Sequence, residues 1–173
     1  QKDDVTWVFH IREGVKFHNG SDMTADDVVY SLKRAAGLLD GQEAALVSEL
    51  DSIKSVDNDN GKVVVTLESP NSELLSYFTV AIIPDEVADI NKTPVGTGPF
   101  VFDSYTIGQD IALTKNSNYW NSELPYIDKA VFKITADMDA GLIELKNGTI
   151  DIFPYLTSDR AHQLDPNSFT ILK

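Results

Sequence analysis

The residues that could support catalysis or metal binding are few and widely spaced in this sequence. The three histidines, His10, His18 and His162, do not stand at metal-ligand spacing with one another or with a carboxylate. Ser21 and Ser31 lie outside any G-x-S-x-G motif of the kind that exposes a nucleophilic serine. Cysteine is absent, which removes thiolate catalysis, disulfides and Cys-based zinc sites. We therefore predict that the chain is not an enzyme and that it needs no cofactor or metal.

The carboxylates offer the strongest competing hypothesis, a hydrolase that uses paired acidic groups. Residues 26–27 and the pair Asp137 and Asp139 stand at the expected starts of helices, where acidic groups complement the helix dipole. Residues 57–61 (DNDNG) resemble a calcium loop, but Gly61 is fifth where an EF-hand requires glycine sixth. A valine-rich strand pattern follows, so we predict a hairpin turn there. These patterns give the hydrolase no support.

A glycine-rich segment, residues 94–100 (PVGTGPF), could be mistaken for a phosphate loop. The third glycine of G-x-G-x-x-G is missing, and Pro99 removes a backbone N–H that a phosphate would use. A strand pattern follows instead of a helix, so no helix N-terminus is available to hold an anion. The segment is predicted to be a tight turn.

Composition excludes some partners. The net charge is −13, from 14 basic and 27 acidic residues, whereas nucleic acids and anionic lipids are bound by basic surfaces. The 173 residues, 42% hydrophobic, can bury one sizeable core. No apolar run approaches the roughly 18–20 residues that cross a bilayer. The first residues lack a signal-peptide pattern, and export after removal of such a signal stays open.

The expected elements mix strands and helices without a regular βαβ alternation, so the fold class is α/β with a mixed sheet and helices. Thr24, with Asp27 three positions later, predicts the N-cap and capping box of a helix over 25–36, which Gly37 ends. Hairpins are predicted at 53–67 and at 100–115 around Gly108. The remaining predicted elements are strands at 5–11, 15–17, 80–83, within 126–134, 150–153 and 169–172, and helices at 72–78, 85–90, 136–146 and 158–164.

Six blocks of the sequence, in order, resemble the motifs of the extracellular solute-binding proteins of family 5. These proteins serve ABC importers of the dipeptide, oligopeptide and nickel type. The blocks are residues 6–20 (TWVFHIREGVKFHNG), 24–34 (TADDVVYSLKR), 83–84 (IP), 94–100 (PVGTGPF), 116–120 (NSNYW) and 145–152 (LKNGTIDI).

The resemblance implies a periplasmic-binding-protein-like fold of type II, of which this chain supplies lobe I only and only in part. Residues 1–90 would form a peripheral sub-lobe, built from hairpins and the helix at 24–36. Residues 91–173 would form part of the main sub-lobe, and the second lobe would be absent. The isolated lobe is expected to expose apolar surface and so to form oligomers.

The function that the resemblance implies is the substrate-binding component of an ABC importer, with peptides as the expected ligands. Such a protein captures its ligand in a two-lobe cleft and delivers it to permease subunits. It would work as a lipoprotein at the extracellular face of the membrane, or in the periplasm. A receptor for an oligosaccharide or a nickel chelate and a peptide-pheromone sensor remain alternatives. Residues 77–83 lack the arginine that nickel-binding members place near this segment, which favours peptides.

By the same resemblance, three segments would face the cleft. They are the loop after the first helix, the segment before Ile83-Pro84, and the segment after residues 150–151. The ligand-binding residues implied there are Gly41, Glu43, Tyr77, Thr79, Ala81, Phe153 and Tyr155. Packing in the core or between lobes is an alternative role for Tyr77 and Phe153. Trp7, Tyr119 and Trp120 are motif residues that we expect in the core.

Overall fold

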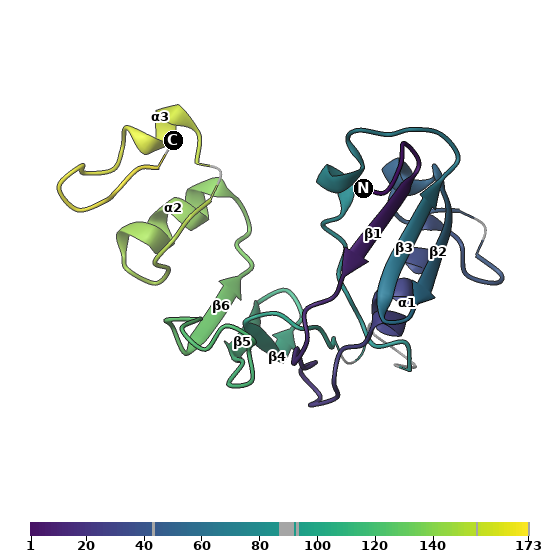
Figure 1. Cartoon of the computed structure of the whole chain (residues 1–173). Coiled ribbons are helices and arrows are strands. Elements are labelled where there is room, and N and C mark those ends of the chain that lie inside the picture. The colour runs from purple at the N-terminus through teal and green to yellow at the C-terminus, as the bar shows by residue number, and fades with distance from the viewer. Residues whose placement is uncertain (43, 87–91, 93, 155, 173) are drawn as a thin grey trace. The chain divides into compact units, whose positions relative to one another are not determined.

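The computed structural model describes all residues except 43, 87–91, 93, 155 and 173 (Figure 1). The chain divides into two compact units. Unit 1 comprises residues 1–102 and 114–129, and unit 2 comprises residues 103–113 and 130–173. The elements in chain order are β1 (Thr6–His10), α1 (Ala25–Ala36), the 3-10 helix η1 (Ser48–Leu50), β2 (Ile53–Asp59), β3 (Lys62–Leu67), the 3-10 helix η2 (Leu74–Tyr77), β4 (Phe100–Thr106), β5 (Asp110–Lys115), β6 (Lys129–Lys133), α2 (Met138–Lys146) and α3 (Ser158–Ala161).

This mixture of strands and helices confirms the predicted fold class. The predicted division into sub-lobes at residues 90 and 91 falls on positions outside those described, and it stays a prediction. Within the described part of the chain, the helices are too short or too polar to cross a bilayer.

Helix α1 begins and ends where the sequence predicts. The Asp27 carboxylate accepts a hydrogen bond from the Thr24 backbone N–H at 2.7 Å, and the Thr24 hydroxyl oxygen accepts from the Asp27 N–H at 3.5 Å. These reciprocal bonds are the predicted capping box. Gly37 ends the helix in the left-handed conformation, with φ of 76°, and its N–H donates to the Lys33 carbonyl.

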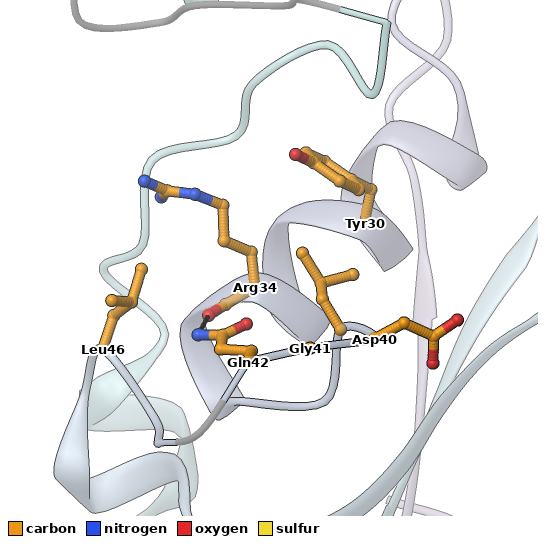
Figure 2. Close-up of a pocket in the computed structure, with 7 residues that line it drawn as sticks. Tyr30, Arg34, Asp40, Gly41, Gln42 and Leu46 are labelled. Atoms are coloured by element: carbon orange, nitrogen blue, oxygen red, sulfur yellow. Dashed lines mark hydrogen bonds between the residues drawn. The ribbon is translucent and has the colours of Figure 1, made fainter.

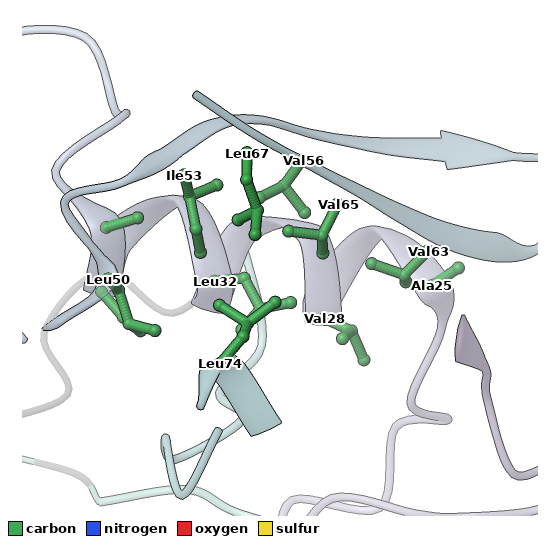
Figure 3. Packing of buried hydrophobic residues seen from close by; sticks show 12 residues of the cluster. Ala25, Val28, Leu32, Leu50, Ile53, Val56, Val63, Val65, Leu67 and Leu74 are labelled. Atoms are coloured by element: carbon green, nitrogen blue, oxygen red, sulfur yellow. The ribbon is translucent and has the colours of Figure 1, made fainter. Parts of the chain in front are cut away.

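Unit 1 is built on an antiparallel sheet with the strand order β1-β3-β2. The β2–β3 hairpin confirms the predicted turn, and Asn60 and Gly61 both have positive φ, as a type I′ turn requires. Every second side chain of β3 points to α1, so Val63, Val65 and Leu67 are buried. Figure 3 shows them between the strands and α1, together with Leu50 and Leu74 of the two 3-10 helices. This cluster is the core of unit 1.

The second sheet has the order β4-β5-β6. It confirms the predicted hairpin at 100–115, which turns at Gly108 with φ of 72°. The Asp137 carboxylate caps α2 by accepting from the N–H groups of Asp139 and Ala140. The helices predicted within 136–146 and 158–164 are also confirmed, the second over fewer residues.

Four predicted strands, at 15–17, 80–83, 150–153 and 169–172, do not form in the described residues. At 15–17, an isolated antiparallel β-bridge pairs the backbones of Lys16 and Asp22. At 80–83, the Ser31 hydroxyl oxygen accepts from the Ile83 N–H at 2.9 Å, and its single hydrogen is shared between the Asp27 carbonyl at 2.8 Å and the Ile83 carbonyl at 3.2 Å. A side chain therefore satisfies the backbone groups that a neighbouring strand would otherwise pair. The predicted helix at 72–78 is the shorter η2, and most of the predicted helix at 85–90 lies outside the described residues.

Candidate functional site

The glycine turn at residues 96–98 is held by side chains from two other motif blocks. His18 Nδ1 accepts a hydrogen bond from the Gly96 N–H at 3.2 Å, so its Nε2 carries the proton and donates to the Gly98 carbonyl at 3.0 Å. The Asn116 amide donates to the same carbonyl at 2.9 Å. Strand β4 starts immediately afterwards at Phe100. The chain bends at residues 97–99, and a strand follows the bend, as predicted, so no helix N-terminus lies there to bind a phosphate.

A pocket of about 390 Å³ lies beside the C-terminal half of α1. Figure 2 shows it between the helix and the loop that follows. Its lining residues are Tyr30 and Arg34 of α1 and Leu39, Asp40, Gly41, Gln42 and Leu46 of the loop.

The loop forms one wall of this pocket because hydrogen bonds tie it to the end of α1. The Gln42 side-chain amide donates to the Arg34 carbonyl at 2.7 Å and to the Ala44 carbonyl at 3.0 Å. The Leu46 N–H donates to the Ala35 carbonyl at 2.9 Å. The Arg34 and Ala35 carbonyls belong to the last turn of α1, where they have no partner within the helix. Satisfying them folds the loop back over the helix.

The side chains of the pocket suit binding more than bond-making chemistry. Tyr30 and Arg34 are four residues apart and share one face of α1. Leu39 and Leu46 add apolar surface, and Leu46 is 59% exposed. Figure 2 shows the Asp40 carboxylate pointing away from the side where the Arg34 guanidinium lies. Tyr30, Arg34, Asp40 and Gln42 carry polar groups, so most of the lining can form hydrogen bonds with a ligand.

Gly41 is the one predicted ligand-binding residue that lines this pocket, among those that the structure describes. Its φ of 77° is a left-handed conformation, which lets the loop turn at this point. Glu43 and Tyr155 lie outside the described residues.

The segment before Ile83-Pro84 alternates between packed and exposed side chains. Phe78, Val80 and Ile82 pack against the core, as does Tyr77, whereas Thr79 and Ala81 are exposed. The Tyr77 hydroxyl donates to the Glu73 carboxylate at 3.1 Å. That hydrogen bond and the negative charge raise the pKa of Tyr77 above its ordinary value.

Phe153 belongs to unit 2, where its ring packs on helix α2. A Cβ atom added at Gly141 would lie 2.5 Å from Cζ of the ring, so the ring rests directly on the glycine. This contact gives Phe153 a structural role, and its contact with a ligand stays a prediction.

The prediction that Trp120 lies in the core is wrong, because 45% of the residue is exposed. The Arg12 guanidinium carbon lies over the Trp120 ring, 4.2 Å from its centroid. The Tyr119 ring is next to it, with the centroids of the Tyr119 and Trp120 rings 5.2 Å apart. The cation and the neighbouring ring hold the indole at the surface. Trp7, by contrast, packs against the core of unit 1 as expected.

Sequence reasoning missed Tyr30 and Arg34 as site residues. Their spacing of four in the TADDVVYSLKR block was a usable signal, because it places both side chains on one helix face. The loop residues carry no comparable signal.

An acidic depression of about 480 Å³ lies at the other end of α1. Its acidic residues include Asp27, whose carboxylate already caps the helix and also accepts from the Asp85 N–H at 3.1 Å. In the described residues, no group of three or more His, Asp or Glu side chains is arranged to hold a metal ion.

Comparison with known proteins decides the family. The family described as bacterial extracellular solute-binding proteins, family 5 (Middle), matches residues 1–170. The chain belongs to this family. Its members are described as extracellular solute-binding proteins, in agreement with the resemblance seen in the motif blocks.

Similar proteins include binders of different solutes. Heme-binding protein A of Haemophilus influenzae is 30% identical over 95% of this chain and 36% of its own length. The dipeptide-binding protein of Escherichia coli is 30% identical over 89% of this chain and 34% of its own. The structure of the oligopeptide-binding protein AppA of Bacillus subtilis, in complex with a nonapeptide, superposes with a TM-score of 0.75. It is 28% identical, with 86% of this chain and 32% of AppA covered.

These likenesses confirm a periplasmic-binding-protein fold, present in part. The chain spans about a third of the length of the relatives that it matches.

Proposed function

We propose that this chain is part of the substrate-binding component of an ABC importer and that its ligands are peptides. The observation that carries the proposal is the family match over residues 1–170, joined to a fold likeness with an oligopeptide-binding protein that holds a nonapeptide. Such a protein encloses its ligand in a cleft between two lobes and passes it to the permease subunits.

The peptide contacts that we propose in this chain come from three segments. The loop after α1 contributes Gly41 and Glu43, and the exposed positions Thr79 and Ala81 stand beside Tyr77. Phe153 and Tyr155 would add contacts from the third segment. Residues 1–90 and 91–173 would act as the peripheral and main sub-lobes. Support for these contacts comes from the exposure of Thr79 and Ala81 and from the pocket at Gly41.

A second candidate function is the binding of a different solute by the same kind of cleft. The likeness to heme-binding protein A of Haemophilus influenzae, over 95% of this chain, favours this alternative. In that case flat apolar ligands, and not peptides, would be found in the protein.

The cellular setting follows from the proposed role. The protein would work outside the cytoplasmic membrane, as a lipoprotein or free in the periplasm, and would dock on permease subunits. The chain by itself would form oligomers through apolar side chains that are more than half exposed in unit 2, such as Ile107, Phe132 and Ile152. Light scattering on the 173-residue chain tests this, and a monomer at high protein concentration would contradict it.

Native mass spectrometry of the full-length protein, purified from its own host, tests the function. An intact peptide that co-purifies supports the peptide importer, and a bound porphyrin, detected by mass and by visible absorbance, supports the second candidate. Peptides that are cleaved during incubation with the protein would show that it is an enzyme and would overturn both.

A further inference from the structure

We propose that the pocket beside α1 binds a carboxylate group and that Arg34 is the residue that pairs with it. The proposal rests on the peptide-binding function and deepens it, because the carboxylate would belong to the peptide, at its C-terminus or on an acidic side chain. It assigns to this pocket a ligand chemistry that the family match does not supply.

Arg34 is available for an incoming anion. Within the part of the chain that the structure describes, its guanidinium makes no hydrogen bond or ion pair. The other two arginines are engaged: Arg160 pairs with Asp139, and the Arg12 guanidinium lies over the Trp120 ring. In a chain of net charge −13, a guanidinium that has no ion-pair partner among the described residues stands out. Its planar set of donors matches a carboxylate through two parallel hydrogen bonds.

Tyr30 provides a second donor on the same wall. It precedes Arg34 by one helical turn, and Figure 2 shows both side chains extending from the same side of α1. No hydrogen bond engages the Tyr30 hydroxyl among the described residues. Arg34 and Tyr30 therefore present a cationic and a neutral donor to the same volume, and both donate well to a carboxylate oxygen.

The apolar part of the pocket indicates what accompanies the carboxylate. Leu39 and Leu46 line the pocket, and the 59% exposure of Leu46 leaves apolar surface for a ligand to cover. An aliphatic side chain next to the carboxylate fits this wall. The Asp40 carboxylate also lines the pocket and repels an anion, but it points away from Arg34 and is exposed to water, which weakens that repulsion.

Complementing the helix dipole is a simpler role for Arg34, which lies in the last turn of α1 beside Lys33. The dipole accounts for a positive charge at either position equally. The dipole does not explain why Arg34 lines the pocket whereas Lys33 does not. Lys33 is therefore the matched control, with the same charge on the same turn but outside the pocket.

The test is an NMR titration of the 173-residue chain with N-acetyl-L-leucine, and with N-acetyl-L-leucine amide as the neutral probe. We expect the acid to shift the Arg34 Nε–H signal and the backbone signals of Gly41 and Gln42. The amide should bind at least about tenfold more weakly, because a hydrogen-bonded charge pair is lost. Arg34→Gln should weaken binding of the acid by a similar factor, Lys33→Gln should leave it unchanged, and Asp40→Asn should strengthen it about twofold.

Equal binding of acid and amide, loss of binding in Lys33→Gln, or no shift at Arg34 with either probe would overturn the proposal. A second titration with trialanine and trialanine amide separates it from the proposed function. If both peptides bind equally well, the peptide function stands and the carboxylate assignment fails. If N-acetyl-L-leucine binds at Arg34 and no peptide is retained by the full-length protein, the pocket assignment stands and the peptide function fails.

Discussion

The two units of this chain place their apolar side chains very differently. In unit 1, one helix covers a three-stranded sheet and buries a continuous cluster that includes Leu50, Val56 and Leu74. In unit 2, the buried hydrophobic residues among those described are Ala112, Leu142 and Leu164, and larger side chains are left exposed. The exposed side chains of unit 2 include Tyr105, Ile107, Val131, Phe132, Ile134, Met138, Ile143, Ile152, Ile171 and Leu172.

The difference shows that unit 1 has a core of its own, whereas unit 2 has apolar surface without enough partners to bury it. A chain that spans about a third of its relatives' length is consistent with this state. We infer that unit 1 sets the stability of the chain and that unit 2 depends on further contacts.

The largest expected effect comes from truncating the core of unit 1. Leu74→Ala should lower the free energy of unfolding by about 2–5 kcal/mol, because Leu74 is fully buried and a cavity would remain. Leu75→Ala, next to it but 51% exposed, is the control and should cost less than about 0.5 kcal/mol. Urea denaturation, monitored by circular dichroism, measures both values.

Truncating an apolar side chain of unit 2 to alanine tests whether that side chain is exposed in solution. Ile143 of α2 is 58% exposed, so Ile143→Ala should resemble the Leu75 control and not Leu74→Ala. A loss for Ile143→Ala as large as that for Leu74→Ala would mean that unit 2 buries this side chain in solution, and the contrast between the units would be wrong.

The next largest effect on stability is expected at Gly37 of unit 1, which lies against backbone atoms, whereas Gly141 of unit 2 lies against a side chain. An alanine Cβ at Gly37 would lie 2.6 Å from the Ala45 backbone nitrogen, and φ is 76°. Gly37→Ala should therefore cost at least about 1–2 kcal/mol and displace the loop that lines the pocket. Gly141→Ala instead meets the Phe153 ring, a side chain that can rotate away, and an alanine favours the helix by about 1 kcal/mol.

We expect Gly141→Ala to change stability little and to shift the aromatic NMR signals of Phe153. Urea denaturation of the two variants gives the energies. A greater loss for Gly141→Ala than for Gly37→Ala would show that the Phe153 ring is fixed, and that unit 2 is packed more tightly than its exposed side chains suggest.

Smaller effects should follow from removing one helix cap in each unit. Thr24→Ala in α1 and Asp137→Ala in α2 each remove a side chain that accepts from backbone N–H groups, which costs about 1 kcal/mol. Amide hydrogen exchange distinguishes where the loss is felt. Thr24→Ala should lower protection across the sheet of unit 1, whereas Asp137→Ala should lower it only in α2 and nearby. Loss of protection throughout the chain from both variants would mean that the two units unfold together.

The sequence predicts the elements whose interacting residues are close together along the chain, and it fails where the partners are far apart in sequence. Helix α1 was predictable at both ends because Thr24, Asp27 and Gly37 act through contacts within a few residues. The predicted strand at 80–83 was wrong because Ser31, 52 positions away, pairs with the Ile83 backbone. Periodicity carries no information about such a partner.

The sequence predicts only part of the pocket, for the same reason. The spacing of Tyr30 and Arg34 could be read from the sequence, since it depends on one helix. The opposite wall depends on Gln42 bonding to the Arg34 carbonyl, which is a tertiary contact within an irregular loop. Resemblance to the family directed attention to Gly41 in this loop, but physical reasoning about the residues alone did not.

The smallest expected effect concerns the ion pair between Arg160 and Asp139 in unit 2, joined at 2.8 Å. The hydrogen bond and positive charge of Arg160 hold the pKa of Asp139 below its ordinary value of 3.8. A carboxyl whose folded pKa is lowered contributes stability above its unfolded pKa, and loses that contribution as the pH falls through the folded value. Both side chains are exposed enough for water to screen the pair, so the contribution is small. A double-mutant cycle of Asp139→Asn and Arg160→Gln, measured by thermal unfolding, should give a slight coupling at pH 7 that disappears in high salt and as the pH falls through the lowered pKa of Asp139. A coupling that persists at low pH would mean that the two residues interact through packing. Unit 2 would then be held together by contacts other than this exposed charge pair.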